Sequence, residues 1–94
     1  MDDWPFDDPP NTAALTTREI LEADAPVLLV THDADDGSWQ FLPGGAVTPA
    51  DSRVVGLGRM CGRDPTLREL ADLPEGWQAW RERPGAVWQR RPRP

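Results

Sequence analysis

The chain has very few side chains that could act as nucleophiles, general bases or metal ligands. Its 94 residues contain one histidine, His32, and one cysteine, Cys61, while lysine and tyrosine are absent. A catalytic cysteine or serine needs a neighbouring base and a third group that orients it, and His32 is the one imidazole available. A zinc site usually needs three or four cysteine or histidine ligands. The sequence therefore predicts no catalytic residue, no metal site and no cofactor, and we do not expect an enzyme.

Three aspartates, Asp33, Asp35 and Asp36, stand before Gly37 in a pattern that invites comparison with a calcium-binding loop. The comparison fails, because placing Gly37 at the sixth position of such a loop puts Pro43 at the twelfth, where a bidentate glutamate is required. The same residues fit a solvated acidic turn between two strands. We predict that these three carboxylates contact a protein partner.

The segment Gly56–Gly62 follows a predicted strand and precedes a predicted helix, which is the setting of a dinucleotide-binding loop. Its spacing is one residue too long, because Cys61 stands where the third glycine would fall. A phosphate-cradling loop built from backbone amides with Arg59 or Arg63 is an alternative to a bulged connection between strand and helix.

The charges are divided unevenly along the chain. Residues 1–52 hold eleven acidic residues and one base, whereas residues 53–94 hold nine arginines and five acidic residues, for a net charge of −6. Either the two halves neutralise each other in the fold, or the acidic half faces a basic partner. The arginines near the C-terminus alternate with tryptophans, but the acidic total argues against nucleic acid as a ligand.

Periodicity and turn residues predict seven short elements. Thr16 and Glu19 fit a capping box for a helix that runs from Thr17 to about Ala23. Asp64 and Pro65 fit the start of a second helix that ends near Asp72. The predicted strands cover residues 27–31, 39–42, 53–57, 77–82 and 86–90, and Pro84-Gly85 fits a type II turn between the last two. The order α-β-β-β-α-β-β predicts an α+β fold, with a mostly antiparallel five-stranded sheet carrying two short helices on one face.

The chain length predicts one domain, which we place at residues 15–91. Residues 1–14 form an acidic, proline-rich lead-in without regular structure, which is either frayed or held on the domain by Trp4 and Phe6; residues 92–94 form a tail. No apolar stretch approaches the ~20 residues that cross a bilayer, and a single cysteine makes no internal disulfide. We therefore expect no membrane association and a cytoplasmic location.

Three segments carry a resemblance to a known family: residues 36–44, residues 64–67 and residues 73–81. Over residues 16–91 the chain resembles the bacterial family called domain of unknown function 2185, which overlaps the immunity proteins of polymorphic toxin systems. The shared motifs are turn glycines, a helix cap and packing aromatics, so the resemblance assigns no catalytic residue. It implies a protein that binds and blocks a toxin.

These observations together predict a non-catalytic protein-binding module that neutralises a toxin, with Asp33, Asp35 and Asp36 facing a basic toxin domain. One alternative is a small enzyme or a binder of phosphates or nucleotides that uses the Gly56–Gly62 segment. Another is a dimer formed through the tryptophan-rich C-terminal hairpin. The sequence leaves the oligomeric state open.

Overall fold

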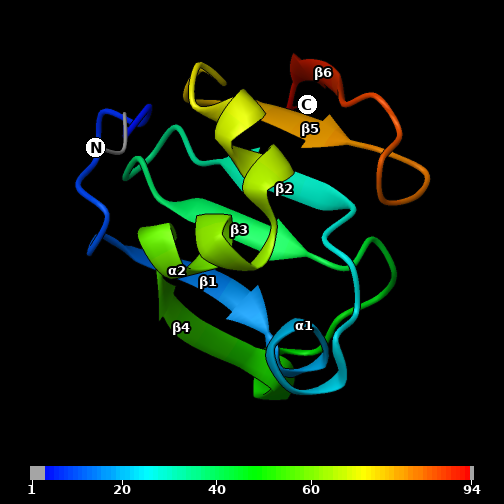
Figure 1. Cartoon of the computed structure of the whole chain (residues 1–94). Helices are drawn as coiled ribbons and strands as arrows, with labels where there is room; N and C mark the ends of the chain where they lie inside the picture. The colour runs from blue at the N-terminus through cyan, green and yellow to red at the C-terminus, as the bar shows by residue number, and fades with distance from the viewer. Residues whose placement is uncertain (1–3, 94) are drawn as a thin grey trace.

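The computed structural model describes residues 4–93, in which six strands form one mixed sheet that carries short helices (Figure 1). In chain order the elements are β1 (Ala13–Thr17), α1 (Arg18–Ala23), β2 (Leu29–His32), β3 (Trp39–Leu42), η1 (Pro49–Asp51), β4 (Ser52–Gly56), α2 (Leu57–Arg63), η2 (Pro65–Leu70), β5 (Trp77–Trp80) and β6 (Gln89–Pro92). The strand order is β4-β1-β3-β2-β5-β6, and the β1–β3 pair alone is parallel. The α+β class is confirmed, whereas the prediction of five strands is wrong by one.

The missing strand is β1, which lies between β3 and β4. It pairs with β4 over five positions and with β3 through Leu15 and Gln40. The sequence Ala-Ala-Leu-Thr-Thr alternates too weakly in hydrophobicity to predict a strand, and it follows a proline-rich stretch. Both of its partners come later in the chain, so pairing at long range, and not local propensity, makes this segment extended.

Helix α1 begins one residue later than the capping box predicts. Thr17 is the N-cap, and its hydroxyl accepts a hydrogen bond from the amide of Ile20 at 3.4 Å. Thr16 is 1% exposed and donates its hydroxyl proton to the carbonyl oxygen of Phe41 at 2.9 Å. Thr16 is therefore used to join β1 to β3, and the next threonine caps the helix.

The glycine-containing segment after β4 is a helix and not a loop. Helix α2 starts directly at Leu57 and buries Leu57, Met60 and Cys61. The second predicted helix is the 3-10 helix η2, and its predicted cap is confirmed, because the Asp64 carboxylate accepts a hydrogen bond from the amide of Thr66 at 3.1 Å. The two helical segments follow one another across the same side of the sheet, α2 near β1 and β3 and η2 over β2 toward β5 (Figure 1).

The closing hairpin is confirmed, with its second strand displaced toward the C-terminus. Gly85 has a φ of +85°, and the amide of Ala86 donates to the carbonyl of Arg83 at 3.1 Å, as the type II turn requires. Strand β6 starts at Gln89 instead of Ala86, because the connection is long enough to turn Trp88 inward, where it is 9% exposed.

The core lies between one face of the sheet and the helices. Val30, Phe41 and Ala79 are neighbours in register on three central strands and are at most 1% exposed. Phe6 joins this core at 5% exposure, with its ring 5.1 Å from that of Trp39, and Trp4 packs against the core as a partly buried residue. Ala13 and Ala14, which are predicted to lie in the irregular lead-in, belong to β1, and Pro92 of the predicted tail belongs to β6. Residues 1–3 and Pro94 lie outside the described residues.

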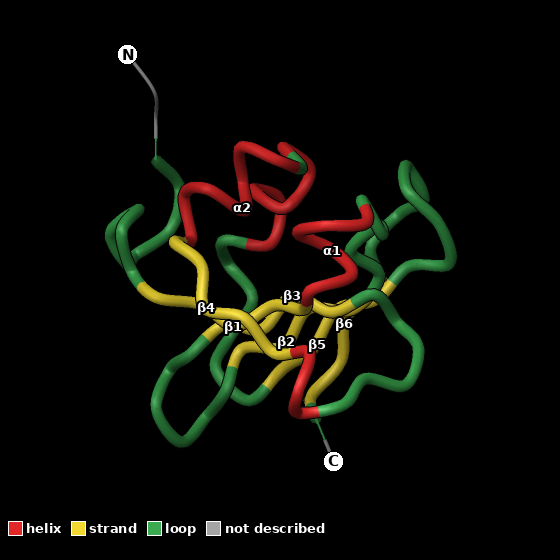
Figure 2. The backbone as a smooth tube through the Cα atoms, turned by 90° about the horizontal axis from the view of Figure 1, so that it is seen from below, coloured by secondary structure: helices red, strands yellow, loops and turns green. Residues whose placement is uncertain are grey.

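Within the described residues, the other face of the sheet carries no α-helix, since α1 and α2 lie together on one side and η1 and loops lie on the other (Figure 2). Because side chains alternate along a strand, the registers assign one set of residues to this second side. We call it the open face; its strand residues are Ala13, Leu15, Thr17, Leu29, Thr31, Gln40, Leu42, Ser52, Val54, Gly56, Gln78, Trp80, Gln89 and Arg91.

Candidate functional site

The predicted contact residues Asp33, Asp35 and Asp36 lie together on the turn between β2 and β3. The turn is closed by hydrogen bonds from the amide of Gly37 to the carbonyl of Asp33 and from the amide of Asp33 to the carbonyl of Ser38, at 2.9 and 2.8 Å. Two of the carboxylates add further bonds, because Asp33 accepts from the amide of Asp35 and Asp36 accepts from the amide of Ser38. The carboxylates are therefore displayed on a turn with a fixed shape.

The charges on this turn are not neutralised by an arginine within the described part of the chain. None of the ion pairs among residues 4–93 includes Asp33, Asp35 or Asp36. A Cβ placed on Gly37 would lie 2.9 Å from Oε2 of Glu75, so a fourth carboxylate stands beside the turn. Hydrogen bonds from Ser38 lower the pKa of Asp36, which keeps that side chain ionised in mild acid. The turn is an acidic surface.

His32 and Cys61, the two residues that sequence reasoning considered for catalysis, have separate structural roles. The ring of His32 stacks on Trp39 at 3.8 Å, and its Nδ1 lies 2.7 Å from the carbonyl oxygen of Leu73. A carbonyl accepts only, so Nδ1 carries a proton and donates it. Cys61 is 4% exposed on α2, and burial raises the pKa of its thiol. No hydrogen bond joins these two side chains within residues 4–93, and the same residues hold no cluster of three or more metal-ligating side chains.

The Gly56–Gly62 segment offers little to a phosphate in this structure. The amide of Leu57 donates to the carbonyl of Thr12 at 2.9 Å, and the amide of Gly58 donates to the carbonyl of Pro10 at 2.8 Å. These are amides that a phosphate loop would use, so a phosphate would have to displace two bonds that tie residues 10–12 to α2.

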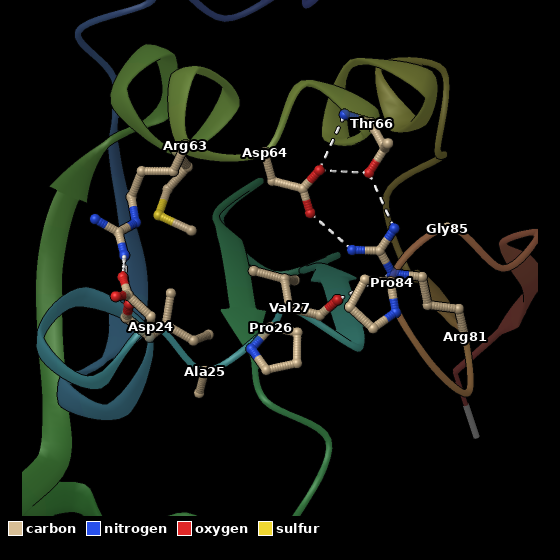
Figure 3. A pocket seen from close by; sticks show the side chains of 12 residues that line it. Asp24, Ala25, Pro26, Val27, Arg63, Asp64, Thr66, Arg81, Pro84 and Gly85 are labelled. Atoms are coloured by element: carbon tan, nitrogen blue, oxygen red, sulfur yellow. Dashed lines mark hydrogen bonds and ion pairs between the residues drawn. The ribbon is translucent and has the colours of Figure 1, made fainter.

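A polar network that sequence reasoning missed surrounds Arg81, whose side chain is 2% exposed (Figure 3). Its guanidinium donates to the carbonyl of Val27 at 3.1 Å, to the hydroxyl of Thr66 at 3.0 Å and to the carboxylate of Asp64 at 2.7 Å. The guanidinium carbon also lies 4.2 Å from the ring centroid of Trp88. In the sequence the C-terminal arginines look alike, since they alternate with tryptophans. The signal that distinguishes Arg81 is that it continues the alternation of β5 toward the buried face.

The same network lines a hollow of about 460 Å³ between α1, the start of η2 and the turn at Pro84. Figure 3 shows Arg63 and Asp24 on one side of the hollow and the Asp64–Arg81 pair on the other. Arg63 and Asp24 are 3.3 Å apart, so each arginine faces its own carboxylate. The lining is thus close to electrically neutral and offers no unpaired charge to hold an anion or to transfer a proton.

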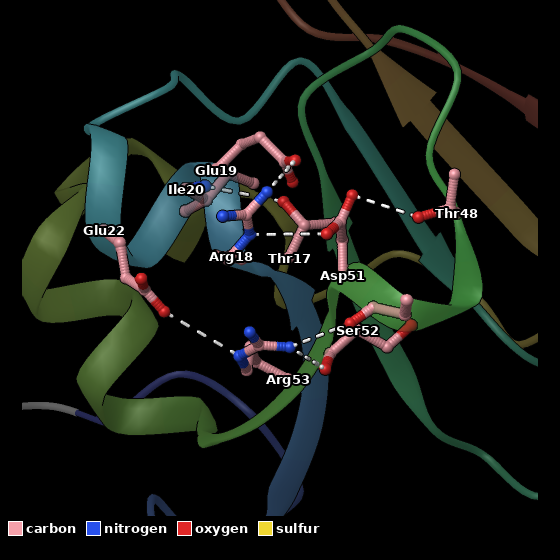
Figure 4. A network of polar contacts seen from close by, with 10 residues as sticks. Thr17, Arg18, Glu19, Ile20, Glu22, Thr48, Asp51, Ser52 and Arg53 are labelled. Atoms are coloured by element: carbon pink, nitrogen blue, oxygen red, sulfur yellow. Dashed lines mark hydrogen bonds and ion pairs between the residues drawn. The ribbon is translucent and has the colours of Figure 1, made fainter.

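A second polar network ties α1 to the start of β4 (Figure 4). Arg18 lies 3.3 Å from Asp51, and Arg53 lies 3.8 Å from Glu22. The hydroxyl of Thr48 donates to Asp51 at 3.1 Å and is the main cause that lowers the pKa of that carboxyl. The partners are largely exposed, and such pairs contribute little to stability, so this network orients α1 more than it stabilises it.

The geometry defines a small α+β protein whose polar sites are ion pairs and hydrogen-bonded turns. None of its helices within residues 4–93 has the length and apolarity that crossing a bilayer requires. No protein-family model and no solved structure matches the chain.

Among curated proteins, the chain is 36% identical over 56 residues to the polyribonucleotide nucleotidyltransferase of Leifsonia xyli subsp. xyli (strain CTCB07). The match covers 60% of this chain but 7% of that enzyme, so it does not establish a family.

Proposed function

We propose that this chain is a non-catalytic protein-binding module that neutralises a toxin, in the manner of the immunity proteins it resembles, and that its acidic turn contacts a basic surface of the toxin. The observation that carries the proposal is the set of three aspartates on a turn of fixed shape, without an arginine partner in the described chain. Carboxylates that are already ordered lose little side-chain entropy on binding, and they attract a basic partner over long distances.

The scarcity of reactive groups supports binding over catalysis. His32 is engaged with Leu73 and Trp39, and the thiol of Cys61 is buried with a raised pKa, which disfavours the nucleophilic thiolate. The hollow beside Arg81 pairs each of its charges internally. An inhibitor needs none of these groups to react, because it acts by covering the partner's active site.

The test compares the wild-type chain with the triple variant Asp33→Asn, Asp35→Asn, Asp36→Asn. Asparagine keeps the carbonyl acceptors that bond to the amides of Asp35 and Ser38, so the turn retains its shape while it loses three charges. A matched control removes three exposed acidic charges elsewhere, through Glu22→Gln, Asp24→Asn and Glu82→Gln.

The tagged proteins are used to capture partners from lysate of the source cells, and each captured protein is purified and assayed for nuclease and other toxic activities. We expect a basic protein that the wild type and the control retain, that the triple variant releases, and whose activity an equimolar amount of wild type blocks. Equal capture by all three proteins, or a captured enzyme that stays fully active when saturated, would contradict the proposal.

A further inference from the structure

The open face differs sharply from the rest of the molecular surface in charge. The chain has 16 acidic residues and ten arginines, yet the open face includes no acidic residue, and Arg91 is its one charged member. Depletion of charge at the centre of a surface patch is characteristic of interfaces between proteins, and most of all of interfaces between identical subunits.

Large apolar side chains remain exposed on this face. Val54 is 70% exposed and Leu15 is 38% exposed; the two lie opposite each other on β4 and β1. Trp80 is half-buried near the other end of the face, with the guanidinium carbon of Arg91 4.9 Å from its ring centroid. Apolar side chains thus lie at both ends of the side of the sheet that α1 and α2 do not cover; Figure 2 shows these two helices on the opposite side.

The centre of the face has unused hydrogen-bonding capacity. Thr31 is buried at 4% exposure, and its hydroxyl has no hydrogen-bond partner within the described chain. Gln40 and Gln78 stand on either side of it in register. The two glutamines are half-buried, and their carboxamides both donate and accept, so they can pair with the same carboxamides of a facing copy.

We propose that the open face is the interface of a homodimer, in which a second copy of this chain packs sheet against sheet. The charge distribution favours a second copy as the occupant, because an uncharged face matches itself. A basic partner would instead bind the carboxylates of the acidic turn at the end of the β2–β3 hairpin. A twofold axis near Thr31 would bring Gln40 and Gln78 against the same residues of the second copy and would cover Leu15, Val54 and Trp80.

The size of the face sets the strength of the dimer. Six strands about 4.8 Å apart, each about 15 Å long, give a face of roughly 25 by 15 Å. Two such faces have a combined outline of roughly 750 Å², below the lower limit of about 1,200 Å² for stable specific interfaces and in the range of weak, transient ones. We therefore expect a reversible dimer that forms at micromolar or higher concentration. Because each copy carries −6, added salt should strengthen the dimer, whereas it weakens binding between the acidic turn and a basic partner.

Sedimentation velocity and light scattering of the purified chain from about 5 to about 500 μM test the proposal. The wild type should rise from 10.5 kDa toward twice that mass, and more readily at high salt than at low salt. Two variants, Gln40→Glu and Val54→Lys, place a charge on the face and should raise the dissociation constant roughly tenfold or more.

The matched control Ala23→Lys adds a charge to exposed Ala23 on α1, on the opposite side of the sheet, and should dimerise like the wild type. Circular dichroism and thermal unfolding show whether each variant is folded. A wild type that stays at 10.5 kDa throughout, or folded Gln40→Glu and Val54→Lys variants that associate like the wild type, would overturn the proposal. Either result leaves the toxin-binding proposal standing, because that test uses the acidic turn.

Discussion

Arg81 provides the most informative perturbation of the fold. Its guanidinium makes three hydrogen bonds to Val27, Thr66 and Asp64, stacks on Trp88 and is almost fully buried. Replacement by methionine retains much of the side-chain volume but removes all three donors and the charge. The unpaired groups left behind, and not the missing contacts alone, dominate the expected cost.

Breaking a buried ion pair by removing one partner costs about 3–5 kcal/mol. The side chain of Asp64 is 24% exposed, so water can reach part of the abandoned carboxylate, and we expect Arg81→Met to cost about 3 kcal/mol. For a domain of this size, that corresponds to a melting temperature lower by roughly 12–24 °C. Arg81→Lys keeps the charge but not the planar fork of donors, and should cost about 1–2 kcal/mol.

Urea unfolding followed by circular dichroism measures these changes, with Arg83→Met as the matched control. Arg83 is two residues away, and its side chain is 74% exposed, so the control should change stability by at most about 0.5 kcal/mol. A double-mutant cycle with Asp64→Ala isolates the ion pair and should give a coupling energy of at least about 1 kcal/mol. A cost below about 1 kcal/mol for Arg81→Met, or equal costs for Arg81→Met and Arg83→Met, would refute this account of the network.

Three further predictions concern the N-terminal segment, the thiol and the helix cap. Phe6→Ala should cost about 3 kcal/mol and make residues 4–12 more sensitive to limited proteolysis, whereas exposed Asp7→Ala should do neither. Burial raises the pKa of Cys61 above its ordinary 9.0, so the folded state holds the thiol proton more tightly than the unfolded chain does. The free energy of unfolding should therefore fall as the pH rises above 9, and Cys61→Ala should lack this dependence. A thiol reagent should react slowly with Cys61 until urea unfolds the chain. Thr17→Ala should cost about 1 kcal/mol in urea unfolding, and equal effects of Thr17→Ala and Thr17→Ser would contradict the capping role.

Local signals in the sequence were enough for the elements whose shape is set by neighbouring residues. The turn at Gly37, the cap at Asp64 and the turn at Pro84-Gly85 are all formed by residues within a few positions of one another. The pairing of β2 with β3 also follows from adjacency, since a short turn joins antiparallel neighbours.

Features that depend on distant partners were not predictable in this way. Strand β1 is extended because β3 and β4 lie on either side of it, and Arg81 is buried because Asp64 and Val27 meet it from other parts of the chain. The sequence showed a basic residue after a strand and could not show that acceptors from two other segments converge on it. The three aspartates were placed on a turn correctly, and their contact with a partner stays a prediction.

The position of β1 makes the β4 end of the sheet depend on a segment from the N-terminal part of the chain. Strand β4 joins the sheet through β1, so a fragment that starts at Arg18 would detach β4 and leave β3 with a bare edge. Such a fragment would expose unpaired amides and carbonyls next to the aromatic core, and it should aggregate rather than refold. Conversely, a separate peptide covering residues 4–17 should restore the six-stranded sheet when it is added to that fragment. The chain is therefore suited to reassembly from two pieces.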